Sequence, residues 1–190
     1  MTRVGVVGLG VMGLPMALNL AKAGFEVAGY DRDSSRQQPV LALGGRPATG
    51  LQDTVEGAEV VLTVLPDSPD VEEVVLGDGG IFAKAPEGLL YVDCSTVRPE
   101  TSVRVAQAAR DRGVRPLDAP VSGGQKGAEE ATLSIMVGGE EEDFRAVKPV
   151  LDAVGKTVVR VGGDGAGQTV KAANQLLVAA SSNSFPKPSC

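Results

Sequence analysis

Val4-Gly-Val-Val-Gly8-Leu-Gly10-Val-Met-Gly13 is the stretch that decides the fold, because an apolar, strand-like run there breaks into Gly-x-Gly-x-x-Gly and opens into a helical pattern. Gly8 would permit a tight turn, Gly10 a close approach of the backbone to a pyrophosphate, and Gly13 close packing of the helix on its strand. The helix N-terminus would then present N–H groups and a positive dipole end to phosphates. Taken alone, the motif also fits an ordinary strand-to-helix turn, so the surrounding sequence has to decide.

An acidic residue follows the second strand-like run. Residues 14–23 have helical apolar spacing that Gly24 ends, residues 25–30 alternate as a strand, and Asp31 comes next. An acid at this place would hold the ribose hydroxyls of a dinucleotide, which favours NAD over NADP. Arg32 has two readings, a partner for the additional phosphate of NADP or a solvated surface charge. The order of strand, glycines, helix, strand and acid predicts a dinucleotide-binding domain.

Strand-like and helix-like segments go on alternating with short links, and residues 119–125 look like a loop of small residues. We expect strands at 59–65, 89–93, 114–118, 132–137 and 156–161, and helices at about 34–43, 50–57, 69–75, 99–112 and 140–154. The apolar run 59–65 is typical of a strand buried on both faces of a parallel sheet. The pattern predicts an α/β fold with a doubly wound, mainly parallel sheet of Rossmann type.

Composition excludes several classes of protein. The net charge is -6, and no apolar run reaches the roughly 20 residues of a membrane span, so we expect neither a nucleic-acid partner nor a membrane partner. No signal-peptide pattern begins the chain, and we expect a cytoplasmic protein. The chain has no histidine and only Cys94 and Cys190, so we expect no metal site, and any general acid or base must be Lys, Asp, Glu, Tyr or Cys.

A lysine stands in an apolar helical segment near the end of the chain. The glycine-rich, hinge-like run 162–167 precedes a helix expected at 168–180, where Lys171 and Asn174 leave the same face and Gln175 lies beside them. Lys171 is either a snorkelling side chain with its ammonium in water or a desolvated acid/base group. Asn174 is either a core amide or a substrate ligand.

Four further segments of the sequence are Gly8-x-Gly-x-Met12-Gly13-x-Pro-Met16-Ala-x-Asn19-Leu, Asp93-Cys-Ser-Thr96, Asp118-Ala-Pro-Val-Ser-Gly-Gly124 and Gly167-Gln-Thr-Val-Lys171-Ala-Ala-Asn174-Gln175. Together they resemble the β-hydroxyacid dehydrogenase family, which includes 3-hydroxyisobutyrate dehydrogenase and tartronate semialdehyde reductase (2-hydroxy-3-oxopropionate reductase). Tyr30-Asp-Arg and Leu65-Pro-Asp-Ser-Pro look closest to the tartronate semialdehyde branch, and the second choice is 3-hydroxyisobutyrate. A histidine follows the catalytic lysine of 6-phosphogluconate dehydrogenase, and this chain has none.

The resemblance implies a role for each candidate residue in hydride transfer between NAD(P)(H) and a small carboxylate-bearing substrate. Lys171 would exchange the proton of the substrate oxygen, with Asn174 orienting the hydroxyl or the lysine. Ser122, Gly123 and Gly124 would hold the substrate carboxylate, although ordinary loop capping is the alternative for Ser122, as it is for Ser95 and Thr96. The cofactor would be held by Gly8, Leu9, Gly10, Val11, Met12, Gly13, Asp31, Arg32, Leu65, Pro66, Ser95 and Thr96.

Two departures from the family pattern lead to further expectations. Ala131 stands where the family usually has glycine, so the turn before the strand at 132–137 is expected to be altered. The family also continues into a helical domain, whereas residues 181–190 read as an atypical tail in which Pro186 and Pro188 cannot continue a helix. We therefore expect an NAD(P)-binding domain at 1–162, a hinge with the start of an interdomain helix at 163–190, and a homo-oligomer. An alternative function is a nucleotide-binding module without turnover.

Overall fold

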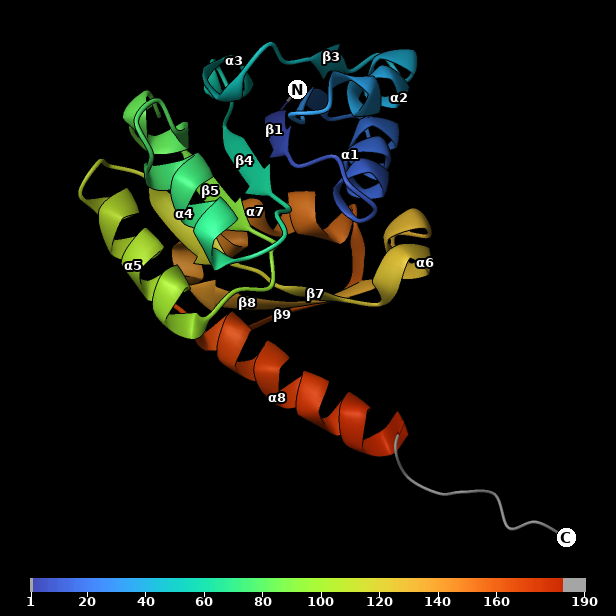
Figure 1. Ribbon diagram of the computed structural model, residues 1–190, viewed down its shortest axis with the longest axis vertical. Coiled ribbons are helices and arrows are strands. Elements are labelled where there is room, and N and C mark those ends of the chain that lie inside the picture. Colours follow the sequence, from blue (N-terminus) through green and yellow to red (C-terminus); the bar gives the residue numbers. More distant parts are fainter. Residues whose placement is uncertain (1, 183–190) are drawn as a thin grey trace, which may run out of the picture.

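A computed structural model describes the backbone of residues 2–182 and the side chains of residues 2–177, and nine strands of this part form one sheet. The strands are β1 (Arg3–Val7), β2 (Glu26–Tyr30), β3 (Arg46–Pro47), β4 (Val60–Thr63), β5 (Leu90–Asp93), β6 (Arg115–Asp118), β7 (Val121–Ser122), β8 (Leu133–Gly139) and β9 (Gly155–Gly162). The helices are α1 (Gly13–Lys22), α2 (Gln38–Ala42), α3 (Leu51–Val55), α4 (Ser68–Leu76), α5 (Pro99–Arg110), α6 (Gly124–Glu129), α7 (Glu141–Asp152) and α8 (Ala166–Ser182), with short 3-10 turns at Ser34–Gln37 and Ile81–Ala83. Figure 1 shows this arrangement.

The sheet is mainly parallel and doubly wound. Its strand order is β3-β2-β1-β4-β5-β6-β8-β7, and β9 pairs with β8. Every pair from β3 to β6 is parallel, whereas β8 runs antiparallel to β6 and β7. The predicted Rossmann-type fold is confirmed. The order of the strands reverses between β1 and β4, and in such sheets ligands bind in the crevice at this point.

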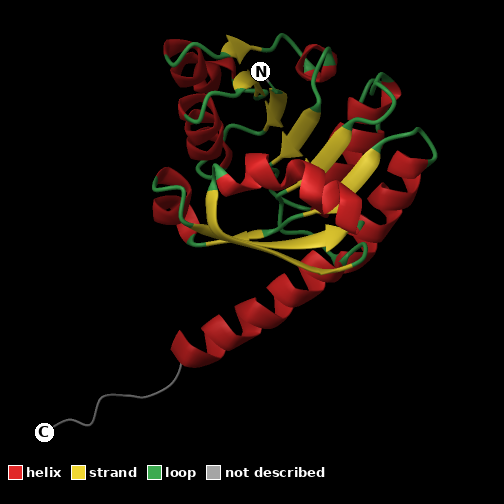
Figure 2. Cartoon of the chain, turned by 180° about the vertical axis from the view of Figure 1, so that it is seen from behind, coloured by secondary structure: helices red, strands yellow, loops and turns green. Residues whose placement is uncertain are grey.

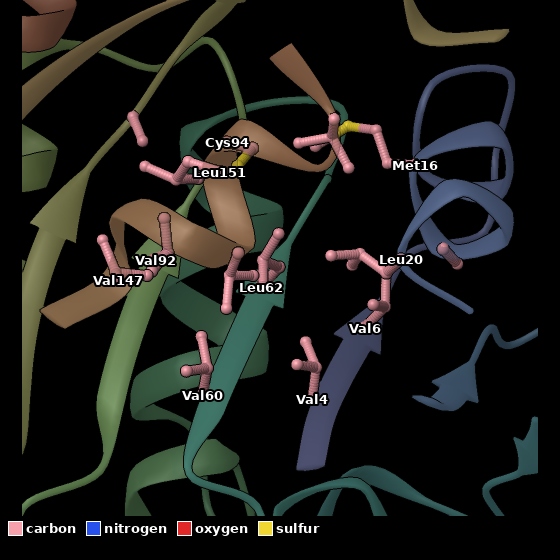
Figure 3. Packing of buried hydrophobic residues seen from close by; sticks show 14 of the residues in the cluster. Val4, Val6, Met16, Leu20, Val60, Leu62, Val92, Cys94, Val147 and Leu151 are labelled. Atoms are coloured by element: carbon pink, nitrogen blue, oxygen red, sulfur yellow. The ribbon is translucent and has the colours of Figure 1, made fainter. Parts of the chain in front are cut away.

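Two apolar layers hold the sheet between helices. On one face, inward side chains of β1, β4 and β5 such as Val6, Leu62 and Val92 meet Met16 of α1 and Leu151 of α7 (Figure 3). On the other face, a second cluster joins the sheet to α3, α4 and α5. Each buried aliphatic side chain contributes about 1.5–3 kcal/mol relative to an exposed one. This burial on both faces explains why the segment 59–65 is apolar along most of its length.

The segment expected as a loop at 119–125 contains short regular elements instead. Val121 and Ser122 form β7 by pairing with Ile135 and Ser134 of β8, and α6 begins at Gly124. The expectation of an unstructured loop was wrong because both elements depend on partners distant in sequence. Asn19 of α1 donates through Nδ2 to the carbonyl oxygen of Ala128 at 2.7 Å, and this bond fixes α6 against α1.

Helix α8 leaves the domain as a single rod (Figures 1 and 2). Its first turn packs on β8 and β9, and its later part extends beyond the sheet. Leu176 and Leu177 are 74% and 71% exposed. The predictions made for Pro186, Pro188 and Cys190 fall outside the described residues.

The turn between α6 and β8 is strained at Ala131, whose φ of 55° lies in the left-handed region. This conformation costs an alanine about 1–2 kcal/mol, and a glycine almost nothing. We expect Ala131→Gly to raise the free energy of unfolding by about 0.5–1 kcal/mol, since the greater freedom of glycine in the unfolded chain offsets part of the gain.

Urea unfolding would measure this change. As a matched control, Ala128→Gly inside α6 should lower stability, because alanine is the better residue in a helix and Ala128 is buried. A loss of stability in Ala131→Gly as well would contradict the assignment of strain to this turn.

Candidate active site

The glycine-rich turn lies at the carboxyl end of β1, against the end of β4. Gly8 has a φ of 92°, and a Cβ added to it would lie 2.3 Å from the carbonyl oxygen of Val64. A Cβ on Gly13 would lie 1.8 Å from the carbonyl oxygen of Gly8. At Gly10 a Cβ would meet only Nη1 of Arg36, at 3.9 Å. Gly8 and Gly13 are therefore required by the turn itself, whereas the face of Gly10 is open to an incoming group.

Asp31 is buried at the end of β2 and is joined to this turn. Its Oδ2 accepts a hydrogen bond from the amide of Leu9 at 2.8 Å, and its Oδ1 accepts one from the amide of Asp33 at 2.9 Å. Arg36 Nη1 lies 3.6 Å from Oδ2. The carboxylate is thus held in one place at the wall of the cavity beside the turn.

A cavity of about 600 Å³ opens along this edge. It extends from the turn at Gly8–Gly13 past Asp31 and Arg32 to Leu65 and Pro66 at the end of β4. Leu9 lies under the turn and is not exposed, whereas Val11 is largely exposed. The structure therefore brings the predicted turn, the acid and the Leu65-Pro66 segment to one cavity.

The loop after β5 is held to the ends of β4 and β5 by a buried polar network. Thr63 Oγ1 donates to Asp93 Oδ1 at 2.9 Å and also bonds the Tyr91 hydroxyl, and Asp93 Oδ1 accepts from the amide of Ser95 at 3.0 Å. Burial raises the pKa of Asp93, and the hydrogen bonds that Asp93 accepts work against this shift. The Ser95 hydroxyl accepts from the amide of Leu65 at 2.9 Å, so Ser95 joins the loops after β4 and β5. Thr96 beside it is exposed.

Lys171 lies on α8 between two contact points of that helix. One turn earlier, Gln168 bonds the loop after β5, and one turn later Asn174 Nδ2 lies 3.5 Å from Ser122 Oγ. Successive steps of three residues keep neighbouring side chains on one side of a helix, so Lys171 lies on α8 between Gln168 and Asn174. Lys171 is only 6% exposed, and burial lowers its pKa.

The segment 122–124 and the helix α8 meet only in part. Ser122 is half-buried beside Asn174, while Gly123, with a φ of 135°, and Gly124 are exposed at the start of α6. Gln175 is exposed. The predicted residues thus lie in one group at the glycine-rich turn and a second group on and beside α8.

Comparison with known proteins identifies the domain. The sequence model of one family, the NAD binding domain of 6-phosphogluconate dehydrogenase, matches residues 3–163. The chain belongs to this family. The resemblance to β-hydroxyacid dehydrogenases, whose nucleotide-binding domain this is, is confirmed by the relatives.

These relatives are dehydrogenases and reductases of small hydroxyacids. The chain is 42% identical to an NAD-dependent L-serine dehydrogenase of Pseudomonas aeruginosa, over 94% of this chain and 60% of the relative. It is 42% identical to 2-hydroxy-3-oxopropionate reductase of Escherichia coli, over 93% of this chain and 60% of the relative. Mycobacterium tuberculosis 3-hydroxyisobutyrate dehydrogenase, solved with L-serine, superimposes with a TM-score of 0.89 at 37% identity, and the match covers 94% of this chain and 60% of that one. The chain thus spans about 60% of the length of these relatives.

Three polar side chains around this NAD-binding site were not predicted. Arg36 lies beside Asp31, Gln168 joins α8 to the loop after β5, and Asn19 holds α6. Gln168 and Asn19 stand inside the motifs that carry the family resemblance, which is the signal that could have found them. Arg36 lies in a polar segment with no pattern that sets it apart from Arg32.

The described part of the chain presents neither a metal-binding cluster nor a membrane-spanning helix. No group of three or more His, Cys, Asp or Glu side chains in it could hold a metal ion. None of its helices has the length and apolar character that crossing a membrane requires.

Proposed function

We propose that this chain is the nucleotide-binding part of an NAD(P)-dependent 3-hydroxyacid dehydrogenase or reductase, with Lys171 as the residue that exchanges a proton with the substrate. The observation that supports the proposal is the burial of Lys171 on the helix that also carries Gln168 and Asn174, which contact Ser95 and Ser122. Buried lysines need a reason, because desolvation of the ammonium is unfavourable. Acid/base work is such a reason, and a lowered pKa suits it.

The residues of the 600 Å³ cavity fit an NAD(P) cofactor. The open face at Gly10 and the N-terminus of α1 would receive the pyrophosphate, and Asp31 would bind the ribose hydroxyls. Leu65, Pro66 and the exposed Thr96 would face the nicotinamide half, held in place by Ser95. When bound, the cofactor supplies or accepts the hydride.

Lys171 and its neighbours would do the remaining chemistry. Reduction of an aldehyde leaves alkoxide-like charge on the substrate oxygen, and the Nζ ammonium of Lys171 would stabilise that charge and give up a proton. In the oxidation direction the neutral amine would take the proton. Asn174 would hold the hydroxyl, while Ser122 and the amides of Gly123 and Gly124 would bind the carboxylate.

The substrate we propose is tartronate semialdehyde, because Tyr30-Asp-Arg and Leu65-Pro-Asp-Ser-Pro resemble the tartronate semialdehyde branch of the family. The second candidate is 3-hydroxyisobutyrate, favoured by the 37% identity to the solved dehydrogenase. Both substrates carry a carboxylate and a redox-active carbon next to the α-carbon, which is an aldehyde to be reduced in the first and a primary alcohol to be oxidised in the second. A turnover panel of small semialdehydes and hydroxyacids tests the proposal, with Lys171→Met as the blank. A binding module without turnover would bind NADH but oxidise none with any substrate.

Cofactor choice should favour NADH. The Asp31 carboxylate at the cavity wall would repel the additional phosphate of NADPH, so we expect NADH to bind at least about tenfold more tightly. Fluorescence titration with both cofactors measures the ratio. Arg32→Ala should leave the NADH affinity unchanged, and a large loss of NADPH affinity in this variant would assign Arg32 to the phosphate. Equal affinity of the unmodified chain for NADH and NADPH would contradict the preference.

We also propose that residues 163–190 form a hinge and the start of an interdomain helix, which includes α8. We propose that the chain self-associates through this helix. Val170, Leu176 and Leu177 are exposed apolar side chains on it, and a contiguous patch of this kind marks a contact surface. Light scattering should show a species larger than the monomer, reduced in the double variant Leu176→Ser/Leu177→Ser. A monomer that binds no exposed-surface dye would contradict this proposal.

A further inference from the structure

Two buried carboxylates stand side by side at the carboxyl edge of the sheet. Asp93 ends β5 and Asp118 ends β6, and the two residues are partners in register. Asp93 holds the loop that follows its own strand. Asp118 reaches to a segment distant in sequence: its Oδ1 accepts from the amide of Gly165 at 2.7 Å and its Oδ2 from the amide of Gln168 at 3.0 Å. Asp118 thereby binds the first N–H groups of α8, which have no partners within the helix.

The side chain of Gln168 uses both ends of its amide on the loop after β5. Its Oε1 accepts from the amide of Val97 at 3.2 Å, and its Nε2 donates to the carbonyl oxygen of Ser95 at 2.8 Å. Gln168 is 2% exposed, so these bonds are shielded from water. Because Ser95 also bonds Leu65, the start of α8 is linked through Gln168 to the loops after both β4 and β5.

The packing around these bonds leaves no room for adjustment. A Cβ on Gly167 would lie 2.4 Å from the carbonyl oxygen of Met136 and 2.7 Å from Asp118 Oδ2. A Cβ on Gly138 would lie 2.3 Å from Asp118 Oδ1. The first turn of α8 therefore has one position on the sheet, and Lys171 follows on the next turn of the same face.

We propose that Asp118 and Gln168 are positioning residues that set the place of Lys171 relative to the loop at Ser95–Val97. Gln168 orients the loop and the helix together, and Asp118 fixes the helix to the sheet. The inference rests on the proposed function of Lys171 and of that loop. It assigns the two residues a task in aligning the proton-carrying amine with the nicotinamide end of the site, beyond holding the fold.

The test compares Gln168→Leu and Gln168→Glu with the unmodified chain. A neutral glutamic acid can accept from Val97 and donate its O–H to Ser95, whereas a carboxylate can only accept and would face the Ser95 carbonyl oxygen. The bridge should therefore reform in Gln168→Glu at low pH. The titratable groups around it are Asp93, Cys94, Asp118 and Lys171. Both proteins contain these groups, so every readout is a ratio to the unmodified chain at the same pH.

The first readout is the rate of reductive methylation at Lys171, followed by mass spectrometry across pH, and it needs no turnover. The second is the affinity for NADH relative to ADP-ribose, which lacks the nicotinamide. In Gln168→Leu we expect Lys171 to react about tenfold faster and NADH to bind about tenfold more weakly, with ADP-ribose unchanged. In both readouts, Gln168→Glu should match Gln168→Leu at about pH 8, where the carboxyl group is ionised, and the unmodified chain at about pH 5.5, where it is neutral. It is neutral there because burial raises the pKa of a carboxyl group.

Thr169→Ala is the matched control, because it removes a bond from the Thr169 hydroxyl to Gly165 on another side of the same helix turn. It should change neither readout. Unaltered Lys171 reactivity in Gln168→Leu, or pH-independent ratios in Gln168→Glu, would overturn the inference. If Gln168→Leu does not fold, the pH response of Gln168→Glu decides. If the unmodified chain binds neither NADH nor ADP-ribose, the proposed function fails, and the Lys171 reactivity still decides the positioning role.

Discussion

Replacing Lys171 by methionine should lower the rate of hydride transfer by about a thousandfold while leaving the affinity for NADH within about twofold. The substitution keeps the volume of the buried side chain and removes the charge that would stabilise the substrate oxygen. Because the lysine is buried, the methionine should not lower stability, since desolvation of an ammonium is avoided. Single-turnover absorbance of NADH with tartronate semialdehyde measures the rate, and a titration measures the affinity.

The pH dependence of the reaction rates should also depend on Lys171. Burial lowers the pKa of Lys171, so the rate of aldehyde reduction should fall as pH rises through this lowered pKa, and the rate of alcohol oxidation should rise through it. The unfolded chain keeps the ordinary, higher pKa, so the free energy of unfolding should increase with pH between the two values. Lys156→Met on the exposed surface of β9 is the control and should change neither rate. Full activity in Lys171→Met would end the role proposed for this residue.

Gly13→Ala should disrupt the dinucleotide site by moving its helix. A Cβ there would lie 1.8 Å from the backbone carbonyl oxygen of Gly8, and neither atom can yield by rotating a side chain. We expect a loss of about 3 kcal/mol or more in the free energy of unfolding, at or above the usual range for overpacking. Where the protein still folds, the dissociation constant for NADH should rise by at least about a hundredfold.

Urea unfolding and NADH titration test this expectation together. Gly50→Ala is the matched control, because nothing lies within 4 Å of a Cβ at Gly50 and its backbone is extended. It should change neither quantity. A stable Gly13→Ala variant that binds NADH normally would contradict the geometry of the turn described here.

The sequence predicted those parts of the molecule that depend on local order. The glycine spacing, the alternation of strands and helices and the acid at position 31 follow from short segments with their own physical signature. The fold class was therefore predicted correctly. The role of Asp31 as a ribose ligand stays a prediction, and the structure adds a bond from the Leu9 amide to the same carboxylate.

The parts that escaped prediction depend on contacts between distant residues. Strand β7 and helix α6 need β8 and Asn19 as partners, so the composition of small residues at 119–125 indicated only a loop. Gln168 lies 73 residues from Ser95 in sequence, and no local pattern shows that the two meet. The expectation of an altered turn at Ala131 stays a prediction; the missing glycine is a local signal, and Ala131 adopts a left-handed φ that glycine would adopt easily.

The central claim is that the turn at Gly8–Gly13 binds the pyrophosphate of a nicotinamide dinucleotide, and Gly10→Ala tests it most directly. In the protein alone a Cβ at Gly10 makes only an ordinary contact with Arg36, so the free energy of unfolding should not change. The measurement is a calorimetric titration of the unmodified chain and of Gly10→Ala with NADH. We expect binding by the unmodified chain and a dissociation constant at least about tenfold higher in the variant, because the methyl group blocks the approach of the phosphates. Equal affinity in the two proteins, or no binding by the unmodified chain, would contradict it.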